Sequence, residues 1–310
     1  MKRIFLLIVI GCAACFNQPL KAQYYYYNDR YYDSEVIVEL GASVGVMNCF
    51  TDLGGKKGSG KKFIKDLNWK NAKPDAGIFA AIMYQNKIGL RLEGTFGNVG
   101  AYDSILKPYV PNTSGRYERN LSFKSKINDL QLSVEIHPLF FFNDYTDKQP
   151  PQLSPYIVAG IGYFSFDPQA KLNGTWFRLQ PLHTEGEGFA EYPYRKPYKL
   201  NQINYPVGAG LRYELSEAFN LRVELIYRIL TTDYLDDVST TYISSDLYAS
   251  YLTPYQAAIA QQLADRKKEI TPGLVAVPGE QRGDPKDKDA FFSIQLKVGI
   301  TLGREKRKGY

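Results

Sequence analysis

Cysteine is scarce in this sequence, with three residues in 310, and two of these, Cys12 and Cys15, lie in an apolar N-terminal stretch. Two basic residues precede the stretch and a cleavage site follows it, which predicts a secretory signal peptide over residues 1–22. An alternative interpretation makes Cys12 a lipid-anchored first residue. Once the signal peptide is removed, only Cys49 remains, which excludes an intramolecular disulfide in the mature protein.

Histidine is also scarce, because His137 and His183 are the only two and neither has the spacing of a metal ligand. His183 lies near Glu185 and Glu187, and this group is the one local candidate for catalysis. A surface enzyme would need a nucleophile and a base held together. The sequence therefore favours no catalytic residue, no cofactor and no metal.

Long apolar runs are missing after residue 22, which excludes a transmembrane helix, because a helix needs about 18 or more apolar residues in succession. Instead, eight stretches alternate apolar and polar residues with a period of two. In the last of them, 292–302, Ile294 and Leu296 share one face, whereas Gln295 and Lys297 share the other. This pattern predicts an all-β fold, an eight-stranded antiparallel transmembrane β-barrel with long external loops and a short loop helix.

The expected strands follow the alternating stretches. They cover residues 35–46, 75–84, a stretch from 88, 121–137, 155–166, two strands joined at 216–218, and 292–302. The fourth stretch changes its apolar phase between Ile127 and Leu130, which predicts a β-bulge. The facing of the glycine-rich fifth stretch stays ambiguous.

The connections between strands alternate in length. The long ones are 47–74, 98–120, 167–204 and 231–290, the tight ones are 86–87 and 216–218, and one of intermediate length is 138–154. Outer-membrane barrels keep tight turns in the periplasm, so both termini are expected there, with the long loops outside. The predicted organisation is a signal peptide at 1–22, a tyrosine-rich lead at 23–34, a barrel at 35–303 and a basic periplasmic tail at 304–310.

A short external helix is predicted within the last long loop. Thr253 and Pro254 begin an alanine-rich stretch that ends near Glu269. Its apolar stripe consists of Tyr255, Ile259 and Leu263. The aromatic cluster 140–142, in the intermediate connection, is expected either in an interfacial girdle or in a packed turn.

Charged residues occupy the inward set of the predicted strands. Five carboxylates stand against five cations: Glu39, Glu93, Glu135, Glu214, Glu224, Arg91, Arg212, Arg222, Arg228 and Lys297. Side chains fill the interior of an eight-stranded barrel, and unpaired charges there are costly, so paired charges would close the lumen. We therefore expect a plugged barrel, not a porin, with a charge network that serves the structure.

Two loop motifs suggest ligand chemistry without its full signature. Segment 55–61 nearly matches a phosphate-binding loop, but Lys62 replaces the Ser or Thr that binds metal. It is better interpreted as a flexible basic loop that contacts lipopolysaccharide phosphates through charge attraction. Asp233, Asp236 and Asp237 offer oxygens for calcium without the EF-hand spacing, so hydrogen bonds that order the loop are expected instead.

Several motifs give the chain a specific resemblance to a known family. They lie at residues 120–125, 155–156, 160–164, 173–182, 184–188, 194–198, 232–242 and 282–287. In these motifs the sequence resembles the PorG-like outer-membrane barrels of Bacteroidota, over about residues 35–302. The resemblance implies a small barrel that ties the periplasmic ring of type IX secretion to the outer membrane. It also singles out a loop motif that consists of Trp176, Glu185, Asp233, Tyr234, Asp236 and Asp237.

The predicted function is a non-enzymatic outer-membrane barrel with a structural or anchoring role in type IX protein secretion. Its predicted partners are outer-membrane lipid, lipopolysaccharide and periplasmic secretion-ring proteins. The net charge of +6 is modest, and no nucleic-acid partner is expected. A surface binding or adhesion barrel with ligand contacts in the long loops is the alternative hypothesis, and a surface enzyme is the third.

Overall fold

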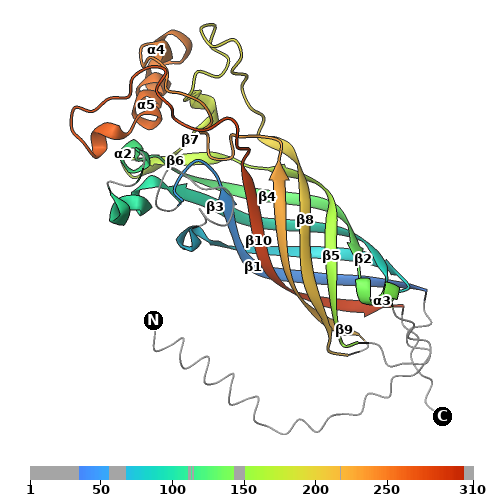
Figure 1. Ribbon diagram of the computed structural model, residues 1–310. Helices are drawn as coiled ribbons and strands as arrows, with labels where there is room; N and C mark the ends of the chain where they lie inside the picture. Colours follow the sequence, from blue (N-terminus) through green and yellow to red (C-terminus); the bar gives the residue numbers. More distant parts are fainter. Residues whose placement is uncertain are drawn as a thin grey trace, which may run out of the picture.

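Eight long strands form one closed sheet in the computed structural model, which describes residues 35–55, 68–110, 113, 115–142, 151–216 and 218–303 (Figure 1). These strands are β1 (Val36–Phe50), β2 (Lys73–Tyr84), β3 (Ile88–Tyr102), β4 (Ser122–Ile136), β5 (Leu153–Ser165), β8 (Asn201–Glu214), β9 (Phe219–Leu230) and β10 (Ala290–Leu302). The predicted signal peptide, tyrosine-rich lead and basic tail lie outside the described residues, as does most of the basic loop 55–61.

The sheet is antiparallel throughout, in the order β3-β2-β1-β10-β9-β8-β5-β4. It closes because β3 also pairs with β4, from Ile88 opposite Ile136 to Tyr102 opposite Ser122. A closed sheet has no edge strand whose backbone groups lack partners. The predicted eight-stranded antiparallel barrel is therefore confirmed.

Alternation along each strand sends apolar side chains outward and polar ones inward. On β4, Leu130, Leu132 and Val134 are 55%, 45% and 42% exposed, whereas Gln131 and Glu135 are buried. Exposed leucines, isoleucines and valines continue this apolar belt around the other strands of the barrel. Since an uncharged apolar belt around a closed barrel is the surface that lipid covers, these strands span a membrane.

The predicted bulge in β4 is wrong. The strand pairs with β3 residue for residue, and its inward side chains run without interruption through Phe123, Ile127 and Gln131. The apolar phase changes because the surroundings change. From Leu130 to Ile136 the outward side chains meet lipid, whereas from Ser122 to Lys126 they are polar and the inward side chains include the apolar Phe123 and Ile127. The fifth strand, whose facing was ambiguous, directs Ile157 outward.

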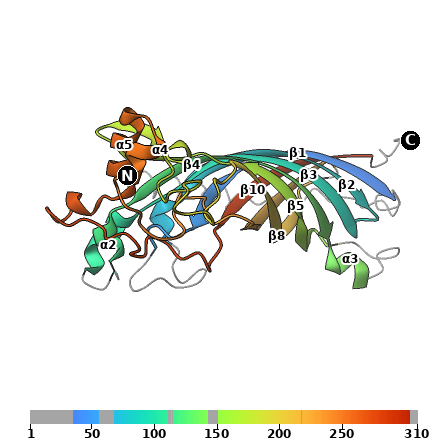
Figure 2. The same ribbon diagram turned by 90° about the horizontal axis from the view of Figure 1, so that it is seen from above.

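The tight turns lie at one end of the barrel and the long connections at the other. β1 begins and β10 ends at the end that carries the β2–β3 and β8–β9 turns. Helix α3 (Pro138–Phe142), from the intermediate connection, lies at this same end, and Figure 2 shows α2, α4 and α5 at the opposite one. On α3, Phe140 is buried, whereas Phe141 and Phe142 are 47% and 84% exposed.

Residues 167–200 and 231–289 fold over the long-loop end and are called the external cap here (Figure 1). The elements at this end, in and beside the cap, are α2 (Arg116–Arg119), β6 (Pro168–Leu172), β7 (Thr175–Arg178), α4 (Leu247–Tyr251), α5 (Pro254–Ala264), and 3-10 turns at Trp69–Asn71, Asp103–Tyr109, Gln180–Leu182 and Lys267–Glu269. None of the helices in the described ranges is long and apolar enough to cross a membrane.

The predicted loop helix is α5, which begins with the expected cap. The Thr253 side chain accepts from the backbone N–H of Gln256, whose own side chain accepts from the backbone N–H of Thr253. The helix ends at Ala264, before the predicted Glu269, because Asp265 is extended. Ile259 and Leu263 are buried as expected. Tyr255 is 70% exposed, so it does not belong to the buried stripe.

An apolar core fills the upper barrel and continues into the cap. It includes Met47, Val99, Phe123, Ile127 and Phe291 from the strands, together with cap residues such as Leu235 and Tyr248. The free Cys49 is buried in this core. The barrel strands and the cap thus share one hydrophobic core above the membrane belt.

Candidate functional site

The ten charged residues predicted to face inward all lie inside the barrel, and none is more than 8% exposed. They come from β1 (Glu39), β3 (Arg91, Glu93), β4 (Glu135), β8 (Arg212, Glu214), β9 (Arg222, Glu224, Arg228) and β10 (Lys297). Each has the inward parity of its strand, so the alternation of the sequence positions it.

An ion-pair network begins at Arg91 in the middle of the lumen. Its Nη1 lies 2.7 Å from a carboxylate oxygen of both Glu135 and Glu224, and its Nε lies 3.1 Å from Glu93. Lys297 bridges Glu93 and Glu224, with Nζ 2.6 Å from each carboxylate. Five side chains from four strands therefore hold one another by opposite charge.

Arg222 carries the network further. Its guanidinium lies 2.8 Å from Glu135 and 2.6 Å from Glu39. Arg212 continues beyond Glu39, at 3.3 Å, to Glu214 at 3.5 Å. Carboxylates and cations alternate along this chain, which offsets the large cost of removing each charge from water.

The network closes the lumen. The side chains of Arg91, Glu135, Arg222 and Lys297 are 0% exposed. A water-filled channel at this level would leave its charged lining open to solvent, as in barrels with more strands. The interior is instead a packed plug of paired charges.

The set predicted from the sequence lacks several further lumen residues, among them Asp129 and Tyr156. Asp129 on β4 lies 2.7 Å from Arg228 and accepts from Asn204 at 2.8 Å. Tyr156 on β5 donates its hydroxyl to Glu224 at 2.8 Å. The predicted bulge hid Asp129, and strict alternation counted back from Glu135 would have found it.

Above the membrane belt, Glu185 lies at the centre of the external cap. Its carboxylate accepts from the backbone N–H groups of Ser239 and Thr240, at 3.0 and 2.8 Å. Arg282 donates to the same carboxylate at 2.9 Å and to the backbone oxygen of Asp237 at 2.6 Å. One buried ion pair therefore joins segments that lie about one hundred residues apart.

The aspartates of the loop motif also accept hydrogen bonds that order the cap. Asp237 accepts from the hydroxyls of Thr184 and Tyr198, both at 2.6 Å. Asp236 accepts from the backbone N–H groups of Leu53 and Val238. Asp233 accepts from the Ser239 hydroxyl at 2.7 Å, and the Tyr234 ring stacks on Tyr198 at 4.9 Å. Within the described part of the chain, no group of three or more His, Cys, Asp or Glu side chains has metal-binding geometry.

Trp176, the remaining member of the loop motif, does not join this cluster. It lies on β7, is 43% exposed, and packs under the Lys124 ammonium at 3.7 Å. The structure thus brings five motif residues together and places the sixth on the outer face of the β6–β7 hairpin.

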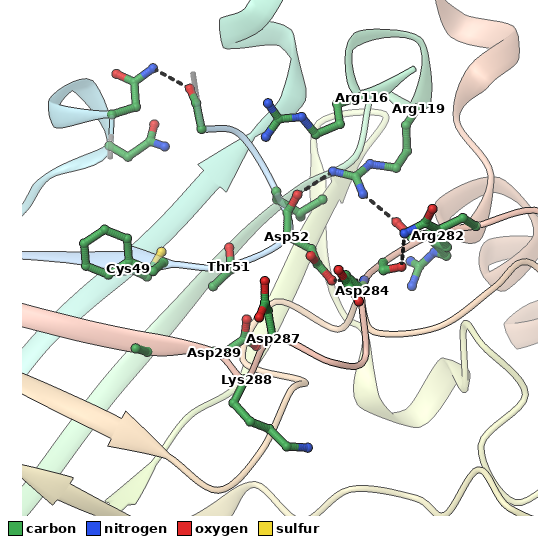
Figure 3. A pocket seen from close by; sticks show the side chains of 18 of the residues that line it. Cys49, Thr51, Asp52, Arg116, Arg119, Arg282, Asp284, Asp287, Lys288 and Asp289 are labelled. Atoms are coloured by element: carbon green, nitrogen blue, oxygen red, sulfur yellow. Dashed lines mark hydrogen bonds between the residues drawn. The ribbon is translucent and has the colours of Figure 1, made fainter. Parts of the chain in front are cut away.

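Arg119, at the end of α2, is a cap residue that the sequence analysis missed. It forms a bidentate pair with Asp103, at 2.8 and 2.9 Å, and donates to the backbone oxygens of Asp52 and Arg282. Figure 3 shows its guanidinium between Asp52 and Arg282. One side chain thus ties the first, second and last external connections together, and its position in a loop gave no periodic signal.

The catalytic candidate at His183 has a structural environment. Its ring packs against Phe189 at 5.9 Å, and burial lowers its pKa. Glu185 is occupied by Arg282 and backbone donors. Burial raises the pKa of Glu187 to about 8, with the nearby charges of Asp237 and Glu185 adding to the effect. These contacts favour an architectural role for the group.

A cavity of about 860 Å³ lies between the first connection, α2 and the end of the last connection (Figure 3). Its lining has both charges: the cations include Arg116, Arg119 and Arg282, and the carboxylates include Asp52 and Asp289. Burial raises the pKa of Asp52 to about 6, and it raises that of Asp289 well above its ordinary value. The cavity is large enough for a small polar ligand.

No family model matches the sequence, and no curated protein matches it. The structure is similar to that of neisserial surface protein A, at 9% identity and a TM-score of 0.37, with 86% of this chain and 97% of that one covered. A major outer-membrane protein of Thermus thermophilus is 11% identical with a TM-score of 0.37, and the match covers 86% of this chain and 99% of that one. Outer membrane protein W of E. coli is 12% identical with a TM-score of 0.33, and the match covers 86% of this chain and 97% of that one. Similarity at this level says nothing about activity.

Proposed function

We propose that this chain is an outer-membrane β-barrel that serves as a non-enzymatic structural component of type IX protein secretion. The observation that carries the proposal is the closed lumen, in which paired charges at 0% exposure leave no path for a solute. A barrel whose lumen is closed to solutes acts through the surfaces that it presents to other molecules. The resemblance of its loop motifs to those of PorG-like barrels supports the secretion role, and the predicted signal peptide supports export to the envelope.

The tight-turn end is the surface proposed to contact the secretion ring. In outer-membrane barrels this end faces the periplasm. Phe141 and Phe142 lie exposed on α3 at this end, and exposed aromatic side chains are common anchors in protein interfaces. The predicted basic tail at 304–310 would extend into the same compartment.

Deletion of the gene followed by measurement of type IX cargo on the cell surface tests the proposal. We expect export to fall sharply and to return with the wild-type protein. Two complementing variants sharpen the test, because Phe142→Asp changes an aromatic residue at the tight-turn end and Tyr194→Asp changes one that is 96% exposed in the cap. Phe142→Asp should impair export and crosslinking to periplasmic proteins, and Tyr194→Asp should not. Unchanged export after deletion would remove the secretion role.

The cavity in the cap favours a second candidate, a surface binding or adhesion barrel. Its lining of opposite charges, with hydrogen bonds from Arg119 and Arg282, is a concave surface at the long-loop end. Binding of whole cells to arrays of immobilised glycans and proteins, with and without the loops 167–204 and 231–290, would test it. Loop-dependent binding with normal cargo export would favour this second function over the first.

A further inference from the structure

One strand of the barrel carries positive charge on its outer face. On β4 the outward side chains run from Leu132 and Leu130 through Asn128 to Lys126 and Lys124, both exposed. Among the described residues of the eight barrel strands, these lysines are the only charged side chains with outward parity. The charge is therefore local to one side of the barrel.

The β6–β7 hairpin adds to this face. β6 pairs with β4 so that Gln169 lies opposite Lys124, and across the hairpin Lys171 lies opposite Trp176. The Lys124 ammonium lies 3.7 Å from the centre of the Trp176 ring, a cation–π contact that joins the two elements. We call Lys124, Lys126 and Lys171 the basic patch.

The charge of the basic patch is not neutralised by neighbours. Arg178, on the same hairpin, is paired with Asp167 at 2.8 Å. In the part of the chain that the structure describes, the three lysines have no carboxylate within ion-pair distance. An ammonium group without a carboxylate partner, on an exposed face, is available to an external anion.

The height of the patch identifies the anion. Lys126 precedes Leu130 by four residues, which is about 13 Å along a strand and less along the membrane normal because barrel strands tilt. The headgroup layer extends roughly 5–8 Å beyond the hydrocarbon on each side, and lysine side chains reach toward it. At the long-loop end of an outer-membrane barrel, this layer contains the phosphate groups of lipopolysaccharide.

We propose that Lys124, Lys126 and Lys171 form a binding site for lipopolysaccharide phosphates, in which the Trp176 ring positions the Lys124 ammonium through their cation–π contact. This site rests on the outer-membrane orientation in the proposed function, but not on a role in secretion. It deepens that function by fixing one side of the barrel against the outer leaflet.

The test compares rough lipopolysaccharide with the same material after chemical removal of its phosphates, each incorporated in nanodiscs with the purified full-length protein. We expect the triple variant Lys124→Gln/Lys126→Gln/Lys171→Gln to bind the phosphorylated form roughly 100-fold more weakly, from a loss of about fivefold for each lysine. The matched control is Lys196→Gln/Lys268→Gln/Lys286→Gln, which removes the same charge from exposed cap positions and should bind like the wild type.

Trp176 provides a second readout. In a Trp69→Phe background it is the only tryptophan, so its emission should change when phosphate draws the Lys124 ammonium from the ring. Equal affinity for phosphorylated and dephosphorylated lipopolysaccharide, or equal loss in the control variant, would overturn the site. Equal binding to phosphatidylglycerol nanodiscs would overturn the assignment to lipopolysaccharide. Unchanged cargo export in the deletion strain would remove the secretion role but would leave the lipopolysaccharide-binding result intact. The two proposals therefore fail separately.

Discussion

The lower and upper halves of this barrel use the same strands with opposite polarity. In the membrane half of β4, Leu132 faces out and Glu135 faces in, and in the upper half Lys124 faces out and Ile127 faces in. The backbone register does not change between them. What changes is the solvent outside, from lipid to water.

This difference shows which part of the barrel each physical effect stabilises. In the upper half, burial of apolar side chains away from water stabilises the fold as in a soluble protein. In the membrane half, outward apolar side chains meet lipid, so they contribute little to holding the strands together. The ion-pair network then specifies how the inner surfaces fit, and its members depend on one another.

The largest effect is expected where the two halves meet, at the pair of Arg228 and Asp129. Arg228→Met leaves a buried carboxylate without its cation and should lower the free energy of unfolding by about 3–5 kcal/mol. The double variant Arg228→Met/Asp129→Leu removes both charges and should recover most of this loss. Guanidinium chloride titration in phospholipid vesicles measures both. A double variant as unstable as the single one would contradict the view that the unpaired charge is the cause.

The sequence predicts the membrane half better than the upper half. Alternation defined ten of the lumen charges, although it missed Asp129, because lipid on one side and a narrow interior on the other leave one arrangement for Arg91 or Glu224. At Ile127 the same reasoning failed, since it assumed that outward always means apolar. A change of phase is the expected pattern of a strand that leaves the membrane, and by itself it does not indicate a bulge.

The second-largest effect is expected from charges placed on the outward face of β4, where they test the upper boundary of the apolar belt. Leu132→Arg places a charge in the middle of the apolar belt and should cost about 2–4 kcal/mol, whereas Asn128→Arg lies at its upper edge and should cost about 0–1 kcal/mol. Both side chains have outward parity on β4. Unfolding in vesicles compares them, and equal costs would mean that the belt extends above Asn128.

The cap was only partly predictable. The resemblance marked Glu185 and three aspartates. In the structure Glu185 and Asp237 contact Arg282, whereas Asp233 and Asp236 accept hydrogen bonds from other cap and loop residues. Arg282 begins the motif at 282–287 but had no role assigned to it, and Arg119 did not stand out among the 38 basic residues. Their importance comes from contacts between segments far apart in the sequence, and no local pattern encodes such contacts.

The smallest expected effect is a pH dependence of stability in the cap, above the upper half of the barrel. Burial raises the pKa of Asp233 in the cap to about 7, with the nearby charges of Asp52 and Glu185 adding to the effect. An unfolded aspartate has a pKa of about 3.9, so between about pH 4 and pH 7 the folded cap binds more protons than the unfolded one. Cap stability should therefore be greatest in mild acid and fall as the pH rises through about 7. Hydrogen exchange of residues 231–245, corrected for intrinsic rates, should show greater protection at about pH 5.5 than at about pH 8. Asp233→Asn should reduce this dependence and the exposed Asp246→Asn should not. Some dependence should remain, because the pKa of Glu187 is also raised, to about 8, and a dependence that Asp233→Asn leaves undiminished would assign it to another group.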